Sequence, residues 1–98
     1  MAKLEDKLTT LRGRIDKVDR KIVNLILQRF QLVEKVSLEK RKKKISIVNH
    51  KREAQILTNV SRIAKDKGYD EDLFREIFQA IIHCTTKFER KLIDSGKE

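Results

Sequence analysis

The sequence has no proline, no tryptophan, three glycines and one cysteine among its 98 residues. So few turn-forming residues argue against a turn-rich β protein and favour long helices. The lone Cys84 cannot form a disulfide within one chain, so we expect a reducing, cytoplasmic setting. No run approaches the roughly 20 apolar residues that a membrane span needs, so no membrane partner is expected.

Charge, by contrast, is abundant: 40% of the residues are charged and the net charge is +9. Such an excess favours an anionic partner, which could be a nucleic acid, an acidic protein or a small polyanion. The length is that of a single small domain, residues 1–98. We see no histidine or cysteine at the spacing of metal ligands, and no cofactor is expected.

Apolar residues recur along the first part of the chain at the spacing of one helix face, which predicts a helix over about residues 4–43. Arg29 is the one charged residue on this seam. A buried guanidinium is costly unless an anion meets it, so the position indicates either a structural ion pair or a place kept for an anionic ligand. The apolar members of the seam are Leu4, Leu8, Leu11, Ile15, Val18, Ile22, Leu25, Leu32 and Val36.

A helix of this length would measure about 60 Å, whereas a chain of this size should have a radius of gyration of about 13 Å. Two further helices are expected, over about residues 49–67, with Asn49 as N-cap and an end near Gly68, and over about 70–94, with Asp70 as N-cap. They are too short to cover the long seam. The expected fold is therefore all-α, with three helices (long, medium, long) in an intertwined homodimeric bundle.

Polar residues interrupt the apolar faces at one level of this hairpin of helices. The third helix rises about 28 Å from Asp70 to Glu89, and the second descends about 27 Å, which returns the third to the end of the first. Arg12 lies about 25 Å from Arg29 along the first helix, so it would reach such a site only from a second chain. The expected site is lined by Arg29, Lys40, Arg52, Glu53, Thr85 and Glu89, with Arg12 of the other chain.

Four segments together resemble the all-helical chorismate mutases over about residues 8–90. Residues 11–19 resemble the family's LRxxIDxxD opening, and residues 25–40 its LLxxR segment with a following lysine. Arg52-Glu53 is similar to its RE pair, and residues 77–82 to its IFxxII motif. The resemblance implies the Claisen rearrangement of chorismate to prephenate, which leads to phenylalanine and tyrosine and needs no metal or cofactor.

The resemblance also implies roles for individual residues. Arg29 and Arg12 of the partner chain would bind the two substrate carboxylates with support from Arg52, because guanidinium groups pair with carboxylates in a bidentate manner. Lys40 and Glu89 would face the ether oxygen and act as catalytic groups with Arg29. The remaining substrate-binding positions are Glu53 for the ring hydroxyl, Thr85 for the substrate or its nearest arginine, and Asn49, where aspartate is common in the bacterial motif.

Glu89 departs from the enterobacterial pattern, which has glutamine there, and agrees with the fungal one. A glutamate donates a hydrogen bond to an ether oxygen only when it is protonated, so we expect activity that declines with rising pH.

Other interpretations stay open at this stage. Arg29 could form a core ion pair with Glu53 or Asp19, and the Thr85 hydroxyl could bond to its own helix. An isochorismate-pyruvate lyase on the same fold is one alternative function. A basic helical dimer that binds nucleic acid is another, although it would not explain polar residues that point inward.

Overall fold

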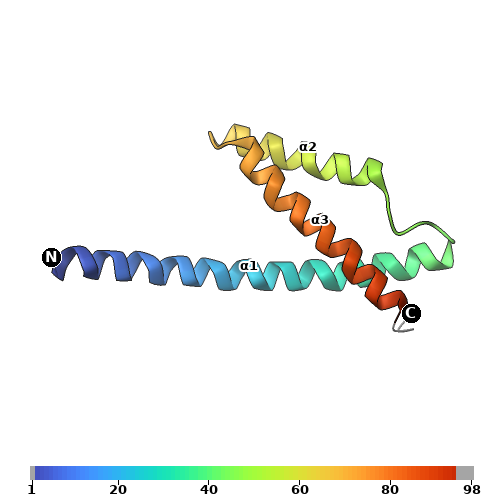
Figure 1. Cartoon of the computed structure of the whole chain (residues 1–98), viewed down its shortest axis with the longest axis horizontal. Helices are drawn as coiled ribbons and strands as arrows, with labels where there is room; N and C mark the ends of the chain where they lie inside the picture. Colours follow the sequence, from blue (N-terminus) through green and yellow to red (C-terminus); the bar gives the residue numbers. More distant parts are fainter. Residues whose placement is uncertain (1, 95–98) are drawn as a thin grey trace. The chain divides into compact units, whose positions relative to one another are not determined.

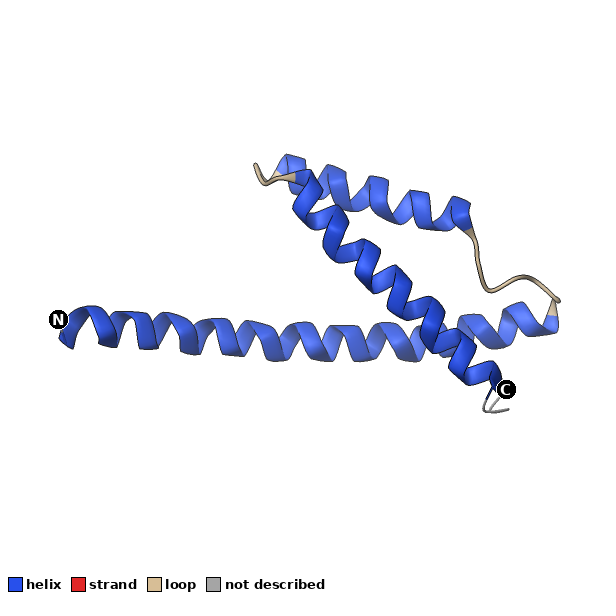
Figure 2. Ribbon diagram, in the orientation of Figure 1, coloured by secondary structure: helices blue, strands red, loops and turns tan. Residues whose placement is uncertain are grey.

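The computed structural model describes residues 2–94, with the side chains of residues 6–94, and this part of the chain contains three α-helices and no strand (Figure 2). The helices are α1 (Ala2–Lys42), α2 (His50–Asp66) and α3 (Glu71–Asp94), in the order that Figure 1 shows. The prediction of an all-α fold is confirmed. The Leu4 side chain, the first of the predicted seam, lies outside the described side chains.

The chain divides into two units, residues 1–32 and residues 33–98. The described part of the first unit is a stretch of α1, whose apolar face is open to solvent. The seam side chains in this unit are between 43% and 61% exposed, namely those of Leu8, Leu11, Ile15, Val18, Ile22 and Leu25. Helices draw most of their stability from burying such a face, so this stretch of α1 lacks its usual source of stabilisation in the single chain.

Within the second unit, α2 and α3 both begin at the predicted N-caps. Asn49 has extended backbone angles, and its Oδ1 accepts a hydrogen bond from the Arg52 N–H at 3.0 Å. Asp70 Oδ1 accepts from the Asp72 N–H at 2.9 Å, directly before α3 begins. Each cap satisfies an N–H group that the helix itself leaves without a partner.

The end of α2 is a Schellman motif, as a glycine at that position predicts. The Tyr69 N–H donates to the Ala64 carbonyl at 2.9 Å, and the Gly68 N–H donates to the Lys65 carbonyl at 3.0 Å. Gly68 has φ of 77°, a left-handed conformation that glycine adopts without steric cost. The turn reverses the chain, so that α3 runs back along α2 (Figure 1).

The apolar core of the second unit is small. Val60 and Ala64 of α2 and Leu92 of α3 are its buried apolar residues. Polar side chains account for as many buried positions, namely Ser37, Ser61 and Glu89. Burying polar groups is unfavourable unless they are hydrogen-bonded. Ser37 and Glu89, which lie on two different helices, are therefore expected to have hydrogen-bond partners.

Candidate functional site

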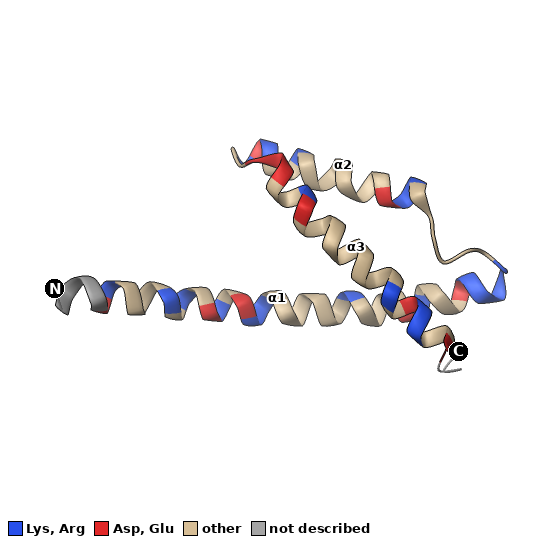
Figure 3. Ribbon diagram, in the orientation of Figure 1, with Lys and Arg blue, Asp and Glu red and all other residues tan. Residues whose placement is uncertain are grey.

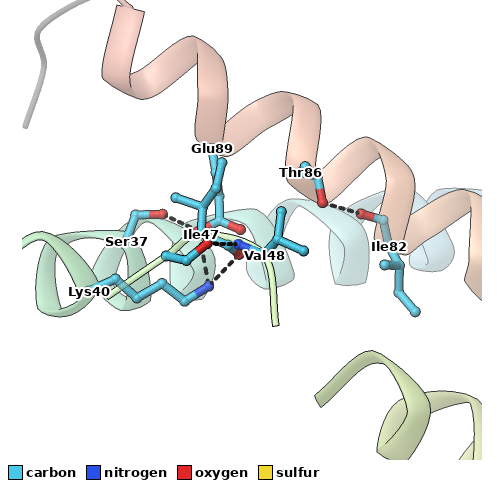
Figure 4. A network of polar contacts seen from close by, with 8 residues as sticks. Ser37, Lys40, Ile47, Val48, Ile82, Thr86 and Glu89 are labelled. Atoms are coloured by element: carbon cyan, nitrogen blue, oxygen red, sulfur yellow. Dashed lines mark hydrogen bonds and ion pairs between the residues drawn. The ribbon is translucent and has the colours of Figure 1, made fainter. Parts of the chain in front are cut away.

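A buried hydrogen bond joins the last turns of α1 to the second half of α3 (Figure 4). Ser37 Oγ donates to Glu89 Oε2 at 2.7 Å, and the two residues are only 2% and 4% exposed. This distance is typical of a well-formed O–H···O hydrogen bond. A buried carboxyl on an otherwise apolar helix face is thus held at a defined place.

Lys40 approaches the same carboxyl from one turn further along α1 (Figure 4). Its Nζ lies 3.5 Å from Glu89 Oε2 and also donates to the Ile47 carbonyl oxygen at 2.9 Å. The Lys40 side chain is 18% exposed. The ammonium group is therefore held between α3 and the connector that follows α1, with access from solvent on one side.

Glu53 lines a groove between α2 and α3 in the second unit. The groove has a volume of about 400 Å³, and its lining is mostly apolar apart from Glu53, Gln79, His83 and Thr86. Glu53 Oε1 lies 3.6 Å from His50 Nδ1, and this contact is an ion pair only when His50 is protonated. The full lining is Val48, Glu53, Leu57, Gln79, Ile82, His83 and Thr86.

Thr85, Asn49 and Arg52 also lie in the second unit. The half-buried Thr85 donates from Oγ1 to the Ile81 carbonyl at 2.8 Å, which is the bond to its own helix that sequence reasoning left open. The Asn49 side chain is engaged in capping α2, and Arg52 is exposed in the first turn of that helix.

Arg12 and Arg29 belong to the first unit. Arg12 is exposed and Arg29 is half-buried on α1. Of the predicted site residues, Lys40 and Glu89 are therefore joined directly, Asn49, Arg52 and Glu53 share the start of α2, and Thr85 lies one turn before Glu89 on α3.

Sequence reasoning missed two parts of this cluster, the Ser37 hydroxyl and the Ile47 carbonyl. Ser37 precedes Lys40 by three residues, so it shares the face of α1 that carries Lys40. That spacing was available in the sequence and could have identified the serine. A backbone carbonyl has no sequence signature, and its contact with Lys40 depends on the path of the connector.

The charges on α3 are distributed unevenly (Figure 3). Glu71, Asp72 and Glu76 outnumber Arg75 in the first part of the helix, and the exposed Lys87, Arg90 and Lys91 flank Glu89 in the sequence of the second. This arrangement is favourable for the helix dipole.

The described residues contain neither a candidate metal site nor a candidate membrane span. Among them, no group of three or more histidine, cysteine, aspartate or glutamate side chains is arranged to hold a metal ion. No helix in the described part of the chain is long and apolar enough to cross a membrane.

Comparison with known proteins places this geometry in context. A family model described as chorismate mutase type II matches residues 11–90. A chorismate mutase from Methanocaldococcus jannaschii is 29% identical over 91% of this chain and 90% of its own length. A 4-amino-4-deoxychorismate mutase from Streptomyces pristinaespiralis is 30% identical over 93% of this chain and 70% of its own length. A T-protein from Enterobacter agglomerans is 30% identical over 78% of this chain and 20% of its own. No solved structure matches the chain.

Proposed function

This chain belongs to the chorismate mutase type II family, and we propose that it catalyses the Claisen rearrangement of chorismate to prephenate. The reaction is intramolecular and breaks the C–O bond of an ether while a C–C bond forms. The enzyme therefore has to hold the dicarboxylate in a compact conformation and to stabilise the negative charge that develops on the ether oxygen.

The observation that carries this proposal is the contact of the partly buried Lys40 with the buried Glu89, 3.5 Å apart. A cation and a carboxyl group on two rigid helices provide two hydrogen-bond donors for one substrate oxygen, provided that the carboxyl is protonated. Lys40 supplies a positive charge close to the developing anion. Because its Nζ is already fixed by the Ile47 carbonyl, little reorganisation is needed during the reaction.

The substrate carboxylates require further cations, for which we propose Arg29 and the partner's Arg12. The proposal rests on the resemblance to the family and on the guanidinium geometry, which suits carboxylates. Arg52 would support them. Glu53, at the groove between α2 and α3, would accept the ring hydroxyl, and Thr85 would hydrogen-bond the substrate or its nearest arginine. Asn49 would contribute at the start of α2.

The exposed seam of α1 supports the proposal that the protein is a homodimer. Each buried Leu, Ile or Val side chain contributes about 1.5–3 kcal/mol, so leaving six of them at 43–61% exposure forgoes a large stabilisation. A second copy with the same seam, related by a two-fold axis, would cover it and bring the partner's Arg12 to the site. We place the enzyme in the cytoplasm, where the exposed Cys84 would stay reduced.

The test is to incubate the purified protein separately with chorismate, 4-amino-4-deoxychorismate and isochorismate and to identify each product. We expect the formation of prephenate from chorismate to be the preferred reaction. Preferred turnover of 4-amino-4-deoxychorismate would identify that compound as the substrate instead, and pyruvate release from isochorismate would indicate a lyase. Salt-sensitive DNA binding without turnover of any of the three would favour the nucleic-acid alternative.

A further inference from the structure

We infer that Ser37 is a positioning residue for this reaction: its hydroxyl orients the Glu89 carboxyl so that Oε1 carries the proton offered to the substrate. The inference rests on the proposed mutase function of the same site. It assigns a role to a residue that the sequence motifs do not include, and its starting point is the 2.7 Å hydrogen bond from Ser37 Oγ to Glu89 Oε2.

Two donors converge on one carboxyl oxygen. Ser37 Oγ and Lys40 Nζ both face Glu89 Oε2, at 2.7 Å and 3.5 Å (Figure 4). A proton on Oε2 would point at these donors and displace at least one of their bonds. Oε2 therefore acts as the accepting oxygen, and protonation of Glu89 takes place on Oε1.

The location of Ser37 suits a fixed donor. It lies on α1 one turn before Lys40, so both donors come from the same rigid helix face. Ser37 is 2% exposed, so water does not compete for the carboxylate. Lys40 cannot orient the carboxyl in the same way, because its long side chain is shared with the Ile47 carbonyl and its contact with Glu89 is longer.

Removing the hydroxyl has two distinct consequences. The carboxyl loses its short bond and can rotate, so either oxygen can carry the proton, and the fraction of productive orientations falls. A donor to a carboxylate also favours its ionised form, so Glu89 in Ser37→Ala should keep its proton to higher pH. A loss of packing or stability alone would lower activity equally at all pH values.

The experiment compares kcat, KM and the pH profile of the full-length wild type with those of Ser37→Ala. We expect kcat on the acidic plateau to fall about 10-fold or more, KM to change less than about 2-fold, and the descending limb to move to higher pH. Ser37→Cys nearly keeps the side-chain volume but has a weak donor, so it should resemble Ser37→Ala.

Ser61→Ala is the matched control. Ser61 is a buried serine on α2, and its Oγ makes no hydrogen bond within the described part of the chain. The same substitution there removes a hydroxyl of similar burial and should leave both kcat and the pH profile unchanged. In a Glu89→Gln background the amide is a permanent donor. Ser37→Ala should then lower kcat less and should not shift the descending limb of the pH profile.

The inference is overturned if Ser37→Ala keeps the wild-type kcat and pH profile, or if Ser61→Ala alters them equally. A wild type that turns over no chorismate refutes the proposed function instead. The hydrogen bond can still be tested without substrate, by a carboxyl-¹³C NMR titration of Glu89. An unchanged Glu89 titration in Ser37→Ala would overturn the positioning role on its own.

Discussion

Lys40 links three parts of the second unit through one ammonium group. Its Nζ donates to the Ile47 carbonyl at 2.9 Å and lies 3.5 Å from Glu89 Oε2, while its own backbone belongs to the last turn of α1. The contact with Ile47 holds the connector against the helix end. The positive charge of this fixed ammonium group is the basis of its proposed role at the substrate ether oxygen.

Replacing Lys40 by methionine should lower kcat by about 100- to 1000-fold, because a preorganised donor at a developing charge contributes on that scale. Steady-state kinetics with chorismate measure the effect. Lys43→Met, which removes the same charge from an exposed position in the same basic run, is the control and should retain activity. A Lys40→Met enzyme with nearly normal kcat would exclude a role at the ether oxygen.

Glu89 should make the activity depend on pH. A carboxyl group donates to an ether oxygen only while it is protonated, so we expect kcat to fall as the pH rises. Glu89→Gln has a permanent donor and should give a flatter profile. A wild-type profile that is already flat between about pH 5 and 8 would contradict this prediction.

At the scale of the helices, α1 ends in a Schellman motif as α2 does, but the left-handed residue is Lys44 in place of a glycine. The Ile45 N–H donates to the Lys40 carbonyl at 2.8 Å, and the Lys44 N–H donates to the Arg41 carbonyl at 3.1 Å. Lys44 has φ of 55°, where a side chain is sterically disfavoured. The end of α1 is therefore strained in a way that the Gly68 turn is not.

Lys44→Gly should stabilise the protein by about 0.5–1 kcal/mol, because relief of the left-handed strain exceeds the entropy that glycine adds to the unfolded chain. Lys44→Ala removes the same charge but keeps the strain, and should show no such gain. Gly68→Ala should destabilise by about 1 kcal/mol. A Cβ at Gly68 would meet no atom within 4 Å, so this cost is conformational. Chemical denaturation measures all three, and equal effects of Lys44→Gly and Lys44→Ala would argue against strain.

Most of the helix ends could be predicted from the local sequence. Asn49, Asp70 and Gly68 are residues whose own chemistry starts or ends a helix, so their roles depend on neighbours within five positions. Lys44 could not be predicted in the same way, since a lysine has no preference for a left-handed turn. Lys44 adopts this conformation because it occupies the turn in which the chain leaves α1.

At the scale of the whole molecule, the exposed seam of α1 predicts association. Ile22, at 47% exposure, lies on the seam, and Ile22→Glu should dissociate the dimer by placing a charge in the interface. Asn24→Glu introduces the same charge at an exposed position off the seam and should leave the dimer intact. Analytical ultracentrifugation distinguishes the two. A dimer that tolerates Ile22→Glu would place the interface elsewhere.

A site shared between chains predicts complementation. Arg12→Ala and Arg29→Ala homodimers should each be nearly inactive, since each would lack one of the two cations proposed to bind the substrate carboxylates. After the subunits are exchanged, half of the dimers are mixed and each has one intact site, so about a quarter of the wild-type activity should return. No recovery, despite exchange verified by mass spectrometry, would show that the two arginines act within one chain.

The sequence by itself determined the helices, their N-caps and the types of residue available for catalysis, because periodicity and capping are local properties of the chain. Tertiary structure decided which of these groups meet. Ser37 and Lys40 lie 52 and 49 positions from Glu89, and no local preference spans that separation. The packing of α3 beside the end of α1 places two donors on one carboxyl oxygen. The path of the connector supplies the Ile47 carbonyl that fixes Lys40.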